Sequence, residues 1–373
     1  MTFIAGTSVT WDSNPLRLTD TDDVQALTGK SSRSDRIVSA YAGIRLDKPY
    51  AQQRFQAEVL KSAHRYENFS YLNFDPLDYR GAWLWQLSPR LSGVISADRT
   101  EALANYADFR NVSQRNVRTT ENQALSADWS AFGGWHVLGA VARREVKNSV
   151  PFSQLPGYDG RGGETGAKYE WAPDRTMGII FRSRDISYVD QPLDPVTLQD
   201  DGGHVTDREL FATWRLSGKS DLEGRVAVVD YRSNHFRERD FSGPTGRLAF
   251  NWTPTGKLKL SLLASRDLGL WNTDYASYRV DKAIALVPAW QISGTASVRV
   301  SLRRFTTDYR NPVPAFTGPL RKDTSNAADL TLDWSPRRNL VLTGNVQREL
   351  RDSNDPTGDF QRTAARLDVS FLF

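Results

Sequence analysis

Hydrophobic and polar residues alternate along most of this chain, over stretches of about 10–16 residues. The last segment places its apolar and polar residues on opposite sides, namely Leu367, Val369, Phe371 and Phe373 against Arg366, Asp368 and Ser370. Segments 247–252, 257–262, 298–303, 328–334 and 339–347 divide in the same way. A period of two is typical of a β-strand with one apolar face. The pattern therefore predicts many long strands.

Tryptophan recurs along the chain with a spacing of 38–44 residues, and each copy precedes a short turn. The repeated positions are Trp85, Trp129, Trp171, Trp214, Trp252, Trp290 and Trp334. A β-propeller has a period of this size, but its four strands per blade need a turn signal about every ten residues. The longer stretches favour two strands, and so one hairpin, per repeat.

Short turns and long polar connections also alternate without interruption. The short turns are expected near 47–50, 87–90, 130–133, 172–175, 217–220, 253–256, 291–294 and 335–338. The long connections are expected near 13–34, 66–77, 100–116, 148–162, 189–204, 233–241, 271–276, 309–321 and 352–358. Eight turns and nine loops join 18 strands. A soluble sandwich of half-buried strands is the alternative, but its strands are usually about 5–6 residues long.

The predicted fold class is all-β, a transmembrane antiparallel β-barrel of about 18 strands that forms one domain over residues 1–373. Such barrels carry short periplasmic turns, longer extracellular loops, an outward apolar band and aromatic girdles at both interfaces. The repeated tryptophan then lies at the periplasmic interface, where its amphipathic ring is favoured. The expected location is the bacterial outer membrane. If the protein is exported, its signal peptide has been removed, since "MTFIAGTSVTW" lacks the pattern of one.

Composition removes several classes of function. Hydrophobic residues make up 39% and charged residues 25% of the chain, and no stretch approaches the roughly 18–20 apolar residues of a membrane helix. The absence of cysteine excludes disulfides and thiolate metal sites. The net charge is +4, but no Lys/Arg block forms the basic patch that nucleic-acid binding needs. No nucleic-acid partner is expected.

Residues with catalytic or metal-binding chemistry are scattered. His64, His136, His204 and His235 lack ligand spacing, and spacing along the chain nominates no serine–histidine pair for hydrolysis. Asp20, Asp22 and Asp23 could bind Ca²⁺, although a solvated acidic loop explains them more simply. We therefore expect no enzymatic activity, no cofactor and no metal site.

The inward-facing side of the strands is rich in charge. Alternation assigns to the lumen a set of candidate substrate-binding residues, namely Arg182, Arg184, Arg215, Arg225, Arg247, Arg299, Arg303, Arg366, Asp329 and Asp333. One interpretation is a network of ion pairs that stiffens the barrel. The other is a polar, net-basic channel, because arginine forks bind carboxylates bidentately. In addition, Phe152 and Tyr158 lie in an expected loop and could stack on a sugar ring.

The segment "VTWDSNPLRL" (9–18) and the segment 34–87 resemble the EpsL proteins, exosortase-associated outer-membrane barrels of exopolysaccharide biosynthesis. Arg17, Gln53-Arg54-Phe55, Arg65-Tyr66 and the pair Trp83/Trp85 carry the resemblance. It implies export of a polysaccharide, acidic in view of the lumen, with outer-membrane lipid or lipopolysaccharide and periplasmic secretion proteins as further partners. The alternatives are a general or substrate-specific porin and a structural barrel that docks secretion components.

Overall fold

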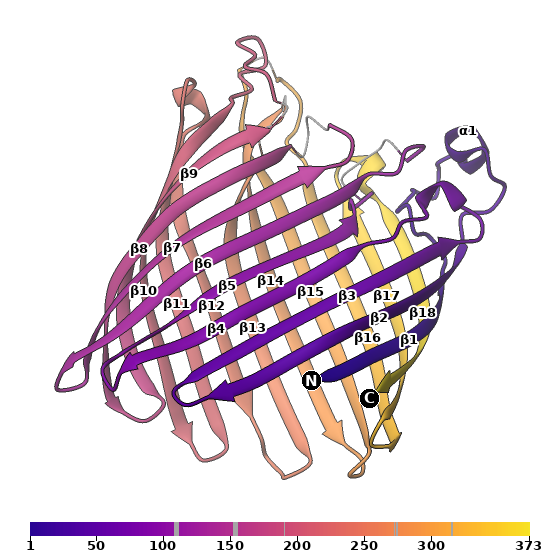
Figure 1. Cartoon of the computed structure of the whole chain (residues 1–373). Coiled ribbons are helices and arrows are strands. Elements are labelled where there is room, and N and C mark those ends of the chain that lie inside the picture. Colours follow the sequence, from indigo (N-terminus) through magenta and orange to yellow (C-terminus); the bar gives the residue numbers. More distant parts are fainter. Residues whose placement is uncertain (108–111, 152–155, 190, 272, 274, 315) are drawn as a thin grey trace.

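The computed structural model describes residues 1–107, 112–151, 156–189, 191–271, 273, 275–314 and 316–373. Its strands form one 18-stranded antiparallel sheet in which each strand pairs with its neighbours along the chain (Figure 1). Strand β1 pairs with β18 from Ile4–Leu372 to Asp12–Ala364, which closes the sheet into a barrel. The predicted fold class is confirmed. Both termini lie at the short-turn end of the barrel (Figure 1).

The strands are β1 (Thr2–Asp12), β2 (Asp35–Tyr50), β3 (Gln53–Tyr66), β4 (Leu77–Ser88), β5 (Leu91–Leu103), β6 (Val117–Phe132), β7 (Trp135–Asn148), β8 (Gly157–Ala172), β9 (Arg175–Val189), β10 (Gly202–Ser217), β11 (Ser220–Ser233), β12 (Phe241–Trp252), β13 (Leu258–Leu270), β14 (Ala276–Gln291), β15 (Ala296–Pro312), β16 (Lys322–Arg337), β17 (Leu340–Ser353) and β18 (Phe360–Leu372). The helical elements are α1 (Val24–Thr28), η1 (Ser70–Leu72), η2 (Arg237–Arg239) and η3 (Pro356–Gly358). No helix in the described parts of the chain is long and apolar enough to cross a membrane.

The first short turn differs from its prediction. It was expected at 47–50, where Pro49 interrupts the alternation, but β2 continues to Tyr50 and pairs Pro49 with Arg54 of β3. The partner on the other side, β1, ends at the pair Thr2–Arg45. Beyond Arg45, β2 therefore has a free edge, where a proline without an N–H is tolerated. The other seven short turns lie at or within a few residues of their predicted positions.

The outward face of the barrel is apolar. Leu248, Leu262, Leu286 and Leu302 lie on neighbouring strands and are each more than 40% exposed. A soluble protein would bury such a band, and a barrel in lipid exposes it. The repeated tryptophans lie near the short-turn ends of the even-numbered strands β4 to β16, and Trp171 and Trp214 meet edge to face at 5.7 Å. They form the predicted aromatic girdle.

A first group of loops packs together at the long-loop end. Leu16, Leu18, Phe69, Tyr106 and Val112 belong to the β1–β2, β3–β4 and β5–β6 connections and form a small buried core with Leu72. Nearby, Asp23 caps α1 by accepting a hydrogen bond from the backbone N–H of Ala26 at 3.1 Å. These loops therefore hold one another in place without a separate domain.

A second group is fastened by Arg239, which is only 2% exposed. Its guanidinium donates hydrogen bonds to the carbonyls of Thr197 and Leu198 in the β9–β10 loop, at 2.8 and 3.1 Å. It also donates to Thr273 and Ala276 at the β13–β14 connection, at 2.5 and 2.7 Å. One side chain from the β11–β12 connection thus joins three loops, which we call the Arg239 clasp.

Candidate functional site: the lumen

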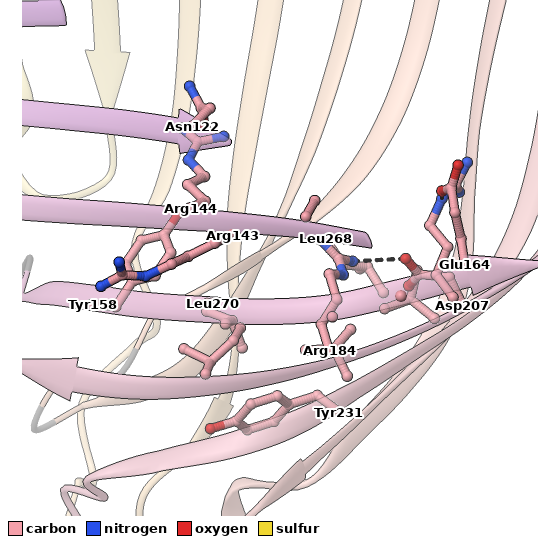
Figure 2. Close-up of a pocket in the computed structure, with 18 of the residues that line it drawn as sticks. Asn122, Arg143, Arg144, Tyr158, Glu164, Arg184, Asp207, Tyr231, Leu268 and Leu270 are labelled. Atoms are coloured by element: carbon pink, nitrogen blue, oxygen red, sulfur yellow. Dashed lines mark hydrogen bonds and ion pairs between the residues drawn. The ribbon is translucent and has the colours of Figure 1, made fainter. Parts of the chain in front are cut away.

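The inner wall encloses a cavity of about 1030 Å³ that is lined by β6 to β13 (Figure 2). Polar and apolar side chains share its surface. The charged residues that line it are Arg118, Arg143, Arg144, Glu164, Arg182, Arg184, Asp207, Glu209, Arg225 and Asp267. This is the mixture of orienting polar groups and apolar surface that is typical of a small-molecule site.

Some of these charges neutralise each other. Arg182 Nε donates to Glu164 at 2.7 Å, and its two terminal nitrogens donate to the two oxygens of Glu209 at 3.0 and 3.2 Å. Arg184 donates to Asp207 at 2.6 Å (Figure 2). The fork of Arg182 on Glu209 has the bidentate geometry that fixes both partners. These pairs lie across neighbouring strands and stiffen the wall.

A glycine makes room for one of these arginines. A Cβ atom on Gly162 of β8 would lie 2.4 Å from Arg184 Cγ and 2.3 Å from the Ser183 carbonyl oxygen. Any larger residue at position 162 would therefore displace the Arg184 side chain or the β9 backbone. The glycine-rich segment "YDGRGG" was expected to be a loop but belongs to strand β8. Its Gly162 leaves space for the Arg184 side chain in the lumen.

The eight candidate arginines divide into two sets of four. Arg182, Arg184, Arg215 and Arg366 have carboxylate partners, the last two being Asp174 at 2.7 Å and Asp368 at 3.0 Å. Within the described residues, no hydrogen bond or ion pair engages the side chains of Arg225, Arg247, Arg299 and Arg303. The ion pairs of the first set agree with the interpretation of a stiffened wall, whereas a solute-binding role of the second set stays a prediction.

The four arginines without a carboxylate partner lie on the inner face of β11, β12 and β15. Arg225 on β11 is directly opposite Arg247 on β12, and Arg299 and Arg303 share the same face of β15. Lys259 on β13 lies between these strands. We call Arg225, Arg247, Lys259, Arg299 and Arg303 the basic strip. Cations without a paired carboxylate on the wall of a lumen raise the local concentration of anions.

The two candidate aspartates have neutral partners. Asp329 accepts hydrogen bonds from Thr331 at 3.1 Å and Asn345 at 2.9 Å, and Asp333 accepts one from Thr343 at 2.8 Å. Within the described part of the chain, neither forms an ion pair with the basic strip on the neighbouring strand. These two carboxylates are therefore held by neutral partners and not by the arginines of the neighbouring strand.

The mouth of the cavity is narrowed by the tip of the β13–β14 hairpin. Pairing between β12 and β13 stops at Gly246–Arg266, whereas β13 and β14 stay paired up to Leu270–Tyr278. Tyr278 stacks on Phe241 at 4.3 Å, inside a cluster that also contains Tyr231. The tip thus leaves its place beside β12 and packs on apolar residues that line the cavity.

Tyr158 and Phe152 were both predicted to lie in a loop, and the structure tests this placement only for Tyr158. Tyr158 does not lie in a loop, since β8 already begins at Gly157, and its ring lines the cavity and packs against the same apolar cluster. The predicted loop placement was therefore wrong for this residue, and stacking of its ring on a sugar stays a prediction. Phe152 lies outside the described residues.

The β5–β6 loop reaches across the long-loop end to the opposite part of the wall. The carbonyl of Ala107 accepts a hydrogen bond from Arg351 Nη1 of β17 at 3.4 Å. Arg351 is held by Asp323 at 2.6 Å and lies over the ring of Phe360. Neither spacing nor alternation indicates this contact, because it joins residues 244 positions apart.

The aspartates clustered in the loops accept hydrogen bonds or form ion pairs within the protein. Asp200, 1% exposed, accepts hydrogen bonds from the side chains of Ser233 and His235 and from the backbone N–H groups of Asp201, His235 and Phe236. Asp20 pairs with Arg33 at 3.1 Å, whereas Asp22 and Asp23 bind backbone N–H groups. These carboxylates fasten loops.

Scans against family models and against curated proteins found no match. Several solved structures share the fold. OccK2 (OpdF) of Pseudomonas aeruginosa gives a TM-score of 0.52 at 12% identity, over 100% of this chain and 96% of that one. OpdK of the same organism gives 0.53 at 11% identity, and a BenF-like porin of Pseudomonas fluorescens Pf-5 gives 0.54 at 12%, each over 100% of this chain and 98% of the other. OccK2 has also been solved with glucuronate, and OpdK with vanillate.

The class of protein follows from these observations. The chain is a closed barrel of 18 antiparallel strands around a polar lumen, with the same fold as these porins. At 10–13% identity the likeness to these porins shows the fold alone. The association with exopolysaccharide secretion implied by the EpsL resemblance finds no support in these neighbours.

Proposed function

We propose that this protein is a porin of the bacterial outer membrane that selects small solutes carrying a carboxylate. The short turns then face the periplasm and the long loops face the exterior. The basic strip carries the proposal, because in the described part of the chain its four arginines keep their hydrogen-bond donors available for a solute. Of these four, Arg225 also lines the cavity. The arginines of the first set, fixed by their carboxylates, shape the wall around it.

The size and lining of the cavity also support this substrate class. A volume of about 1030 Å³ suits a small molecule, and Tyr231, Phe241 and Leu270 give the cavity an apolar lining beside its charged residues. Glucuronate and vanillate, present in two structurally similar porins, are both small carboxylates. A solute with one carboxylate and one apolar or ring face would contact both the charged and the apolar residues of the cavity.

Current block in planar bilayers tests this proposal. Glucuronate and vanillate added to one side should interrupt the current of single barrels, whereas glucose and vanillyl alcohol should not. Arg225→Gln/Arg247→Gln should shorten the blocks, because a charge-assisted hydrogen bond contributes about 1.5–3 kcal/mol. Arg366→Gln, already paired with Asp368, serves as the control. Equal block by the neutral solutes would contradict the proposal.

Export of an extracellular polysaccharide is the second candidate. It rests on the resemblance of residues 9–18 and 34–87 to the EpsL proteins, and the basic strip would suit an acidic glycan. Lipopolysaccharide and periplasmic secretion proteins would then be further partners. Deletion of the gene should abolish the secreted glycan under this function, whereas a solute porin leaves secretion intact and slows growth on its substrate.

A further inference from the structure

We infer that this barrel carries a second, separate activity: a Ser183–His204–Asp185 triad on its outer surface that hydrolyses acyl esters of membrane lipids. Ser183 Oγ lies 3.1 Å from His204 Nε2. His204 Nδ1 lies 2.7 Å from Asp185 Oδ1. Hence one ring nitrogen faces the hydroxyl and the other faces the carboxylate, which is the connectivity of a serine hydrolase. The inference does not depend on whether the lumen conducts.

Strand register brings these residues together. His204 of β10 is directly opposite Asp185 of β9, and Thr206 is opposite Ser183. All four positions share the outward face with the apolar residues Ile179, Phe181 and Leu210. Because Asp185 accepts from Nδ1–H, the neutral imidazole presents Nε2 as an acceptor to the serine hydroxyl. The serine thereby gains a positioned general base.

The triad lies at the height where lipid esters are found. Thr206, opposite Ser183, is eight residues from the girdle residue Trp214 on β10. This corresponds to about 27 Å along the strand, or about 20 Å along the membrane normal at a tilt of roughly 40°. The outward apolar band is about 25 Å tall. The hydroxyl therefore lies near the boundary between acyl chains and headgroups of the outer leaflet.

Two neighbouring features fit a lipid substrate. Beside His204, a hollow of about 220 Å³ is lined by Arg208 and Arg232. Arg208 pairs with Asp230 at 2.9 Å, whereas Arg232 has no ion pair or hydrogen bond within the described residues. Arg232 can therefore bind a phosphate headgroup.

Below the triad, an outer groove of about 1090 Å³ begins at Pro244 and Ile179 and runs toward Trp135. Its exposed lining is almost entirely apolar, with Leu210, Val226 and Leu248 among its walls. An acyl chain whose ester lies at Ser183 would extend toward the membrane centre along this groove. The headgroup and the acyl chain of one lipid thus each have a matching surface.

The reaction needs no cofactor. Ser183 Oγ forms a bond to the ester carbonyl carbon while its proton passes to His204 Nε2. On collapse of the tetrahedral intermediate, the bond to the alcohol oxygen breaks and that oxygen takes the proton. Water then attacks the acyl-serine ester and gives a proton to His204, and this proton returns to Ser183 as the fatty acid leaves. Asp185 is a positioning residue that holds the imidazole and stabilises its cation.

Hydrolysis is measured with the purified barrel in vesicles of phosphatidylethanolamine and phosphatidylglycerol, and separately with lipid A in mixed micelles. Mass spectrometry detects released fatty acid, and a fluorophosphonate probe reports the reactive serine. We expect hydrolysis of at least one lipid and a labelled peptide that contains Ser183. Ser183→Ala and His204→Ala should lower the rate by about 1,000-fold or more. Asp185→Asn should lower it less and shift the pH profile, and Asp185→Glu should restore part of it.

Ser187→Ala is the matched control, because Ser187 shares the strand and the outward face but does not contact a histidine within the described residues. It should hydrolyse lipid at the wild-type rate. Heat-dependent mobility on gels verifies that every variant forms the closed barrel. The inference is overturned if folded wild-type protein releases no fatty acid from either lipid and Ser183 is not labelled. It is also overturned if Ser183→Ala keeps the wild-type rate.

Discussion

Replacement of Arg239 by methionine should loosen three loops at the long-loop end while the barrel stays closed. Methionine keeps much of the side-chain volume but removes every donor that now binds Thr197, Leu198, Thr273 and Ala276. Thr273 and Ala276 are 1% and 0% exposed, so water does not reach their carbonyls in the folded state. A buried acceptor left without a partner costs about 1–3 kcal/mol. The carbonyl of Thr273 loses the guanidinium donor, and that of Ala276 keeps only weaker bonds from Thr273, so the local cost is about 2–4 kcal/mol.

Hydrogen exchange measures this cost. A local destabilisation of about 2–4 kcal/mol raises the opening equilibrium by about 30-fold to 1,000-fold. Faster exchange should appear in peptides that contain Gly202 and Gly203, and in peptides that contain Ser277 to Val280, but not at the short-turn end. Arg237→Met is the control, since Arg237 belongs to the same short helix and is exposed. If exchange in the Arg239 variant stays within threefold of wild type, or matches that of the control, the clasp does not hold the loops.

Two further predictions concern the loops. The pKa of His235 is raised by its hydrogen bond to Asp200, so Asp200→Asn should lower it toward the ordinary value of about 6.5, as followed by NMR titration. Burial opposes ionisation of Asp200, but hydrogen bonds from His235 and Ser233 hold its pKa below the usual range. Its stabilisation is complete above about pH 4 and is lost on acidification, whereas that of His235 is complete below about pH 6.5 and fades as pH rises. The loops should thus be most stable between these two pH limits. An unchanged His235 pKa in the Asp200→Asn variant would contradict the coupling between the two residues. A protease site inserted between Pro192 and Leu193 should be cut on whole cells and one between Gly218 and Lys219 should not, and the reverse result would invert the topology.

The fold could be predicted from the sequence because a lipid-facing barrel imposes one strict pattern. Over its membrane-facing part, a strand such as β16 shows apolar residues to the outside at every second position, and tryptophans such as Trp252 and Trp334 mark one end. The prediction of turns and loops failed where a residue type that is typical of loops also occurs in strands. Pro49 is typical of a turn but also tolerates a free strand edge, and glycines such as Gly162 are typical of loops but also admit a neighbouring side chain.

The site was predicted only in part. Alternation assigns Arg182 and Arg225 to the same inner face, yet only the register between strands decides that Arg182 meets Glu164 and Glu209 while Arg225 meets another arginine. The contact between Ser183 and His204 depends on register in the same way. Contacts between loops, such as those of Arg239, follow no period, so the sequence could not indicate them.

The reversal potential of single barrels in a potassium chloride gradient tests the central claim most directly. The basic strip should make the wild-type pore prefer chloride, because uncompensated charges that line a lumen govern ion selectivity. Arg225→Gln/Arg247→Gln/Arg299→Gln/Arg303→Gln should reduce or abolish this preference. The charge-conserving controls Arg215→Gln/Asp174→Asn and Arg366→Gln/Asp368→Asn should keep it. A wild-type pore that prefers potassium, or a quadruple variant with wild-type selectivity, would contradict the account.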